Sequence, residues 1–392
     1  MDAGRSAAAN KSRIAFQDVT NRVEQDDVSK LGKGKGKKRT AHTMHSVADV
    51  AKVKKSVAKV KKSAPLPKTA VTQRSSGAVV RAIPNPNNPQ PKLSSSGITA
   101  VVAAAKARDI DERDSDNPLM CTSYVQDMYQ YFRTQESRAV ADPYMGDDED
   151  AIQPELTEKM RAIHVDWLVD IHHKMKYDPA TLHLAVQILD RFLATAVKKA
   201  SKKNLQLIGA GSFYIASKYE EIYTIPLRDF TYVCGRLYTE DDILSMETTI
   251  LKALTYQISL PTSRTFLVRF LNAAGALADR RLCSLTQYIL EKSLHSSTLV
   301  IKYTPSQLAA AAVLIGRFAI GRPSWSATLV RYAEYGEDDI IPIAREVMDE
   351  YKKLRFDLID LTAVERKYSR DEYYKVIDKV ASTALFLQNS KN

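Results

Sequence analysis

Residues 157–193 constrain the fold of this chain more than any other segment. On a helical wheel their first half places apolar side chains on two faces, with the polar residues confined to one narrow stripe. The broad apolar face holds Met160, Ile163, Trp167, Leu168, Ile171 and Met175, the face behind it Ala162, Val165 and Val169, and the stripe Lys159, Asp166, Asp170 and His173. A helix that is apolar around most of its circumference is normally buried by neighbours on several sides. We therefore expect a central helix of an all-α domain.

A second helix follows this one directly. Asp178 can cap its N-terminus, and Pro179 stands at the first helical position, where the missing amide hydrogen would have had no partner. Apolar residues then recur at helical spacing, namely Leu182, Ala185, Leu189, Phe192 and Ala196. A second helix is therefore predicted directly after the first.

Helical patterns continue along the rest of the chain. Three more helices are predicted at 202–219, at 227–234 and from Thr239, where a capping Thr precedes an acid three residues on. After a turn at 259–263 the patterns recur at 266–276, 282–294, 305–320, 324–335 and 340–356. The spacing of Tyr124, Met128 and Phe132 predicts an amphipathic helix in front of all of these. The sequence thus predicts two tandem five-helix bundles preceded by an N-terminal helix.

Charge separates a basic tail from an acidic remainder. Residues 1–108 carry 22 Lys and Arg against 6 Asp and Glu, whereas the remainder carries 35 against 40. Residues 1–116 contain one Phe and no Trp or Tyr, too little apolar surface to offset the entropy of ordering, so we expect a disordered tail. Because the basic charge lies in the tail, the folded part does not indicate a specific nucleic-acid partner.

Two motifs carry a family resemblance. Residues 160–193, read as MRAIxxDWLVD followed by TLHLAVxxxDRFL, resemble the signature of the cyclin box, and ASKYEEIY at 216–223 resembles the next motif of that family. The resemblance implies two cyclin boxes, at 157–258 and 259–385, with a packing helix at 117–138 and an acidic loop at 139–156. It also implies a regulatory subunit that activates a cyclin-dependent kinase and supplies no catalytic group.

The resemblance assigns a kinase-binding groove. In cyclins a Lys and a Glu matching Lys218 and Glu247 bond to the backbone of the kinase helix that carries the catalytic glutamate. Both residues stand among apolar side chains, where an unpaired charge is costly, so the alternative is that they satisfy each other. The apolar contacts implied around them are Ile215, Tyr219, Leu251, Tyr256, Tyr124 and Met128.

A second surface is implied on the opening helix. The residues that match the shallow patch by which cyclins dock Arg-x-Leu segments of substrates and inhibitors are Met160, Ile163, Trp167, Asp170, Leu205 and Gln206. An apolar strip beside a carboxylate suits an Arg and a Leu two residues apart. Two residues depart from the family pattern: His164 stands where Leu is frequent, and Asp170 where Glu is common. The alternative is that Met160 and Ile163 belong to the core.

The tail contains two further candidate motifs. RIAFQDVTN at 13–21 resembles the destruction box of mitotic cyclins, with Arg13 and Asn21 in place and Phe16 where Leu is usual. It implies degradation through the anaphase-promoting ubiquitin ligase. The lysine runs at 32–39 and 51–64 could serve as a nuclear import signal, as acceptors of ubiquitin or as a nonspecific contact with phosphates. An equally good interpretation is that they only increase solubility and bind no partner. We expect the protein to lie in the nucleus and the cytoplasm, with a distribution that changes with the cell cycle.

Other classes of protein find less support. No catalytic or phosphate-loop motif is present, the histidines His172, His173 and His183 lack a completing ligand, and the three cysteines are scattered, so neither an enzyme, a cofactor nor a metal site is predicted. No apolar run is long enough to cross a membrane. We predict a B-type, G2/mitotic cyclin. The alternatives are an A-type cyclin, a helical scaffold without a kinase, and a cyclin-fold transcription factor resembling general transcription factor B. Such a factor would be expected to have a zinc ribbon and basic helices in its folded part.

Overall fold

The computed structural model describes residues 107–146, 151–322, 325–356, 361–377 and 379–380. They belong to one compact unit that spans residues 93–392, while a second unit, residues 1–92, lies outside the described residues. The described part consists of helices, turns and loops without a strand, so the all-α prediction is confirmed. The motifs predicted in the tail at 13–21, 32–39 and 51–64 lie outside the described residues.

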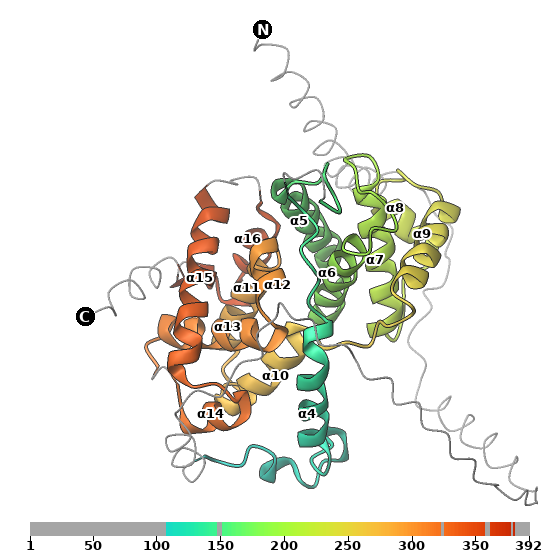
Figure 1. The fold of residues 1–392 in the computed structure, drawn as a ribbon. Helices are drawn as coiled ribbons and strands as arrows, with labels where there is room; N and C mark the ends of the chain where they lie inside the picture. Colours follow the sequence, from blue (N-terminus) through green and yellow to red (C-terminus); the bar gives the residue numbers. More distant parts are fainter. Residues whose placement is uncertain (1–106, 147–150, 323–324, 357–360, 378, 381–392) are drawn as a thin grey trace, which may run out of the picture. The chain divides into compact units, whose positions relative to one another are not determined.

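The first bundle begins at the segment that dominates the sequence. Its helices, coloured green to yellow in Figure 1, are α5 (Glu158–Met175), α6 (Pro179–Leu193), α7 (Leu205–Glu220), α8 (Leu227–Val233) and α9 (Glu240–Ala253). The predicted caps are present: the Asp178 carboxylate accepts from the backbone N–H of Ala180 at 2.8 Å, and Thr239 forms a capping box with Asp242. Local sequence thus sets where these helices begin.

The second bundle repeats the succession of long helices. These are α10 (Ser263–Ala273), α11 (Arg280–Ser293), α13 (Pro305–Ala319), α14 (Ala327–Ala333) and α15 (Glu337–Phe356). Two short helices were not predicted, α12 (Ser297–Lys302) and α16 (Ala363–Tyr368). Six residues make fewer than two helical turns, too few to display an apolar period. Thr304 and Pro305 open α13 as its cap and first residue, in agreement with the helix predicted from residue 305.

The segment that precedes the bundles rests on the second one. On α4 (Val125–Gln135), the Tyr129 hydroxyl donates a hydrogen bond to the carbonyl oxygen of Thr265 at 3.0 Å, and the Arg133 guanidinium donates one to the Tyr335 hydroxyl at 2.7 Å. Upstream, Ile110 is buried and Asp111 pairs with the buried guanidinium of Arg269 at 2.5 and 2.6 Å. The prediction of disorder is therefore wrong for residues 107–116, which carry a core side chain and half of a buried ion pair.

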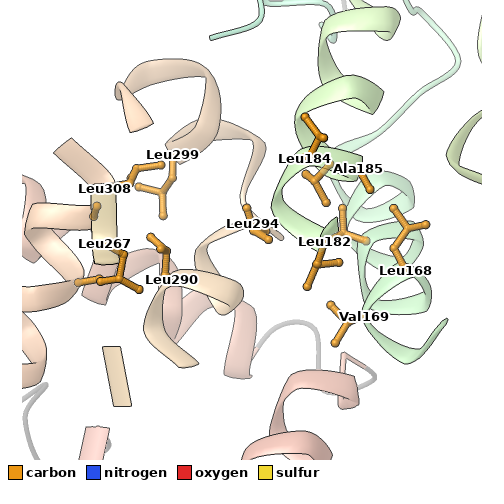
Figure 2. Packing of buried hydrophobic residues seen from close by; sticks show 14 of the residues in the cluster. Leu168, Val169, Leu182, Leu184, Ala185, Leu267, Leu290, Leu294, Leu299 and Leu308 are labelled. Carbon is orange, nitrogen blue, oxygen red and sulfur yellow. The ribbon is translucent and has the colours of Figure 1, made fainter. Parts of the chain in front are cut away.

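α5 is covered on two sides, as its sequence predicts. It packs against α6 and α7 of its own bundle and against α12 and α16 of the second. Most buried apolar side chains of both bundles form one continuous cluster, and Figure 2 shows Leu294 between the groups contributed by each. Ala162, Leu354 and Leu361 form a small second cluster. The most heavily buried helices, however, are α6, α7, α11 and α13, so α5 is central as a junction between bundles.

A buried arginine ties this junction together. Arg161 on α5 is fully buried, and its guanidinium donates to both oxygens of Asp190 at 2.7 Å and to the hydroxyl of Tyr144 at 3.0 Å. The remaining nitrogen donates to the carbonyls of Leu294 and His295 at 2.9 and 3.2 Å. Because these carbonyls follow α11, one side chain links both bundles, which spacing along the chain did not reveal.

Candidate functional site

Lys218 and Glu247 meet on the surface of the first bundle. Lys218 lies in the last turn of α7 and Glu247 in the middle of α9, and their side chains form an ion pair. The Lys218 side chain is 39% exposed and that of Glu247 is 12% exposed. The Lys218 ammonium also lies 4.6 Å from the centre of the Tyr214 ring, a cation–π arrangement. In the chain without a partner, the two charges thus satisfy each other, the alternative left open by the sequence.

Exposed apolar side chains flank this ion pair in the chain. Tyr219 and Tyr256 are half-exposed or more, and the Tyr219 hydroxyl bonds to that of Ser259 at 2.6 Å. Ile222 and Tyr223, not predicted as site residues although they end the KYEEIY motif, are 90% and 88% exposed. Apolar side chains this exposed, beside a partly desolvated ion pair, indicate a surface for a protein partner.

The remaining residues predicted for this surface are placed less uniformly. Leu251 is half-buried and packs on the core, and Ile215 is buried, so Ile215 supports the surface from beneath. Tyr124, at the start of α4, and Met128, within it, are partly exposed. Among the hydrogen bonds, ion pairs and ring contacts of the described residues, none joins Tyr124 or Met128 to Lys218 or Glu247. The residues that the structure brings together are those of α7, α9 and the turn after α9.

The residues predicted for docking form a strip on α5 and the start of α7. Ile163 is 44% exposed, whereas Met160, Trp167 and Gln206 are half-buried and Leu205 is buried. Met160 and Trp167 pack on the core with one side and face outward with the other. The alternative that Ile163 is a core residue is therefore wrong.

His164 lies beneath this strip and not on it. The ring is buried and stacks on Trp167 with 5.2 Å between ring centres. It reaches so close to α7 that a Cβ atom on Gly209 would stand 1.7 Å from Nε2, which explains glycine there. Burial, with a smaller effect of the Arg161 charge, lowers the pKa of His164 to about 3. The position of His164 in the family's patch pattern therefore does not make it a surface residue, because its side chain is buried and stacks on Trp167 from below.

Asp170 already has an internal partner. Arg366 of α16 donates from Nη2 to both of its carboxylate oxygens, at 2.6 and 2.7 Å. Burial raises the pKa of Asp170, and the Arg366 charge acts in the opposite direction. Asp170, which was predicted to bind the arginine of a docked segment, is thus bound to Arg366 of the same chain, 196 positions away.

Two negative findings concern the described residues alone. They contain no group of three or more His, Cys, Asp and Glu side chains that could hold a metal ion. None of their helices is both long and apolar enough to span a membrane.

These features define an all-α protein of two helical bundles. The family model described as "Cyclin, N-terminal domain" matches residues 127–259, and that described as "Cyclin, C-terminal domain" matches residues 261–382. The chain belongs to the cyclin family. Members of this family are regulatory subunits, and the prediction of a cyclin of the B, or G2/mitotic, type is confirmed.

Curated relatives match about two thirds of the chain. The "G2/mitotic-specific cyclin S13-6" of Glycine max is 37% identical over 67% of this chain and 55% of its own length. The "G2/mitotic-specific cyclin-B2" of Oryzias luzonensis is 36% identical over 69% of this chain and 67% of its own length. "Cyclin-B2-1" of Oryza sativa subsp. japonica is 39% identical over 67% and 60%, respectively. Matches therefore span 55 to 67% of these relatives.

Proposed function

We propose that this protein is the regulatory subunit of a cyclin-dependent kinase and activates it at the G2/M transition. The observation that carries the proposal is the Lys218–Glu247 ion pair at the surface, with exposed Tyr219, Ile222 and Tyr223 close by in the chain. Burying these apolar side chains under a partner would drive association, and the ion pair would set its orientation.

The proposed mechanism is a population shift in the kinase. On binding, Lys218 and Glu247 would exchange part of their mutual bond for bonds to the backbone of the kinase helix that carries its catalytic glutamate. A helix held in this way keeps its glutamate against the ATP-binding lysine, the arrangement that the active state needs. The cyclin itself contributes binding energy and no catalytic group, so the effect is on the fraction of active kinase.

The direct test is activation of a purified kinase. We expect the full chain to raise phosphorylation of a peptide substrate by at least one member of a panel of cyclin-dependent kinases, by orders of magnitude over the kinase alone. Activation of no member, under conditions in which an established cyclin activates the panel, would contradict the proposal. Activation of a kinase that does not co-purify with this protein would indicate a mechanism other than the proposed stable complex.

The timing of the function is proposed from the tail. We infer that RIAFQDVTN at 13–21 directs degradation at mitotic exit through the anaphase-promoting ubiquitin ligase, and that the lysine runs support a nuclear as well as cytoplasmic distribution. An extended degron needs its arginine and its apolar anchor, so Arg13→Ala and Phe16→Ala should lengthen the mitotic half-life to a similar degree. Phe16→Leu should be neutral or shorten it. A normal half-life for Arg13→Ala would refute the degron.

The strip of Met160, Ile163 and Trp167 is proposed to dock substrates and inhibitors of the kinase. Ile163 offers an exposed apolar side chain, and Trp167 a rigid aromatic surface that the buried His164 holds in place. Short extended segments bind to such strips through one or two apolar anchors. The question left by the structure is what the neighbouring Asp170 recognises.

A further inference from the structure

The carboxylate at one end of the docking strip, that of Asp170, is already bound by another residue of this chain. Both oxygens of Asp170 accept from Nη2 of Arg366, at 2.6 and 2.7 Å. The Arg366 side chain is 60% exposed and that of Asp170 is 29% exposed, so the pair lies at the surface where a docked segment would reach it. Asp170 is also the only carboxylate among the seven residues predicted for the strip.

Arg366 is held in this position by the helix that carries it. At the N-terminus of α16, the backbone N–H of Ala363 donates to both oxygens of Asp166 on α5, at 3.1 and 3.3 Å. On the other side, the buried Lys367 donates to both oxygens of Glu291 on α11, at 2.7 and 2.8 Å. α16 is thus bonded to α5 and to α11, and these bonds hold the backbone of Arg366 in place next to Asp170.

The other charges near the strip are of both signs. The loop that leads to Leu205 and Gln206 holds Lys202 and Lys203, both exposed, whereas Asp166 on α5 adds a negative charge that acts on Asp170. With Asp170 bound to Arg366, an arginine of a partner would have to displace an internal guanidinium of the same chemistry. Such an exchange yields little net free energy, because one ion pair replaces another.

We propose that Arg366 acts as the built-in cation of Asp170, so that the strip selects partners by an apolar side chain and does not require the arginine of an Arg-x-Leu segment. The proposal rests on the docking function proposed above. It makes Arg366 a specificity-determining residue, although this residue lies outside the motifs that resemble the family. The favoured occupant is an extended segment with an apolar anchor and a neutral residue in place of arginine.

Two labelled peptides, one with Arg-x-Leu and one with Gln for Arg, test this on the full chain by fluorescence anisotropy. We expect the wild type to bind the Gln peptide at least as tightly as the Arg peptide. Arg366→Gln frees Asp170 and should tighten binding of the Arg peptide by about 5-fold or more, with little change for the Gln peptide. Adding Asp170→Asn should abolish the gain. The matched control, Arg370→Gln, removes an exposed arginine just after α16 and should change nothing.

Two results would overturn the proposal. One is a wild type that prefers the Arg peptide by more than about 10-fold, and the other is an Arg366→Gln variant that binds both peptides as the wild type does. Binding of neither peptide by any variant would overturn it together with the docking function. Kinase activation, measured on the same preparations, then shows whether the regulatory role stands without the docking strip.

Discussion

Asp190 and Asp170 each bind an arginine through both carboxylate oxygens, and the two pairs differ in burial. Asp190 and its partner Arg161 have 6% and 0% of their side chains exposed, whereas Asp170 and Arg366 have 29% and 60%. Replacing Asp190 by Asn leaves a buried guanidinium without its counter-charge, which costs about 3–5 kcal/mol of unfolding free energy. The same change at Asp170 should cost about 1 kcal/mol or less, because water solvates the freed arginine. Urea denaturation of the two variants measures the difference, and equal losses would refute the assigned burial.

Buried neutral histidines should make stability depend on pH. Burial lowers the pKa of both His164 and His183 to about 3, against about 6.5 in an unfolded chain. Below pH 6.5 the unfolded chain therefore binds protons that the folded chain does not, and stability falls as the pH decreases from 6.5 towards 3. Each histidine contributes about 1.4 kcal/mol per pH unit well below 6.5. Urea midpoints between pH 7.5 and 5 should fall less steeply for His183→Gln than for the wild type; identical slopes would contradict the prediction.

At the scale of elements, the segment before α4 decides where the folded part begins. Deleting residues 1–106 should leave the melting temperature nearly unchanged, because their composition offers little apolar surface to bury. Deleting residues 1–116 also removes the buried Ile110 and leaves the buried Arg269 without Asp111, so a loss of about 3–5 kcal/mol is expected. Calorimetry of both truncated chains compares them directly. Equal melting temperatures would show that residues 107–116 contribute nothing to stability.

How far the sequence predicts these elements depends on how local their causes are. Apolar period and caps act within a few turns, so α5, α6 and α9 could be predicted from Trp167, Asp178 and Thr239. α16 could not, because its six residues are placed by bonds to Asp166 and Glu291 on distant helices. For the same reason the pairing of Asp170 with Arg366 escaped prediction. The position of Arg161 gave a usable signal, a charge inside an apolar motif, but the motif indicated none of its partners.

At the scale of the whole molecule, two Lys–Glu ion pairs at the surface allow an effect on kinase binding to be distinguished from an effect on stability. Lys218–Glu247 lies on the first bundle beside residues proposed to contact a kinase. Lys302–Glu346 lies on the second bundle, with 2.6 Å between charged atoms and side chains 54% and 29% exposed. Removing either pair should change the unfolding free energy by about 1 kcal/mol or less, since exposed pairs contribute little. Only the first should matter for the kinase, because only there would a partner desolvate the charges.

The most direct measurement is the affinity of the full chain for its proposed kinase partner, by titration calorimetry. We predict that Lys218→Ala with Glu247→Ala weakens binding by at least about 30-fold, because truncating a hydrogen-bonded charge in a desolvated interface costs roughly 2–5 kcal/mol. Lys302→Ala with Glu346→Ala should bind as the wild type does, and both variants should melt at nearly the wild-type temperature. Wild-type affinity for the first variant, or an equal loss in both, would contradict the assignment of the kinase-binding surface.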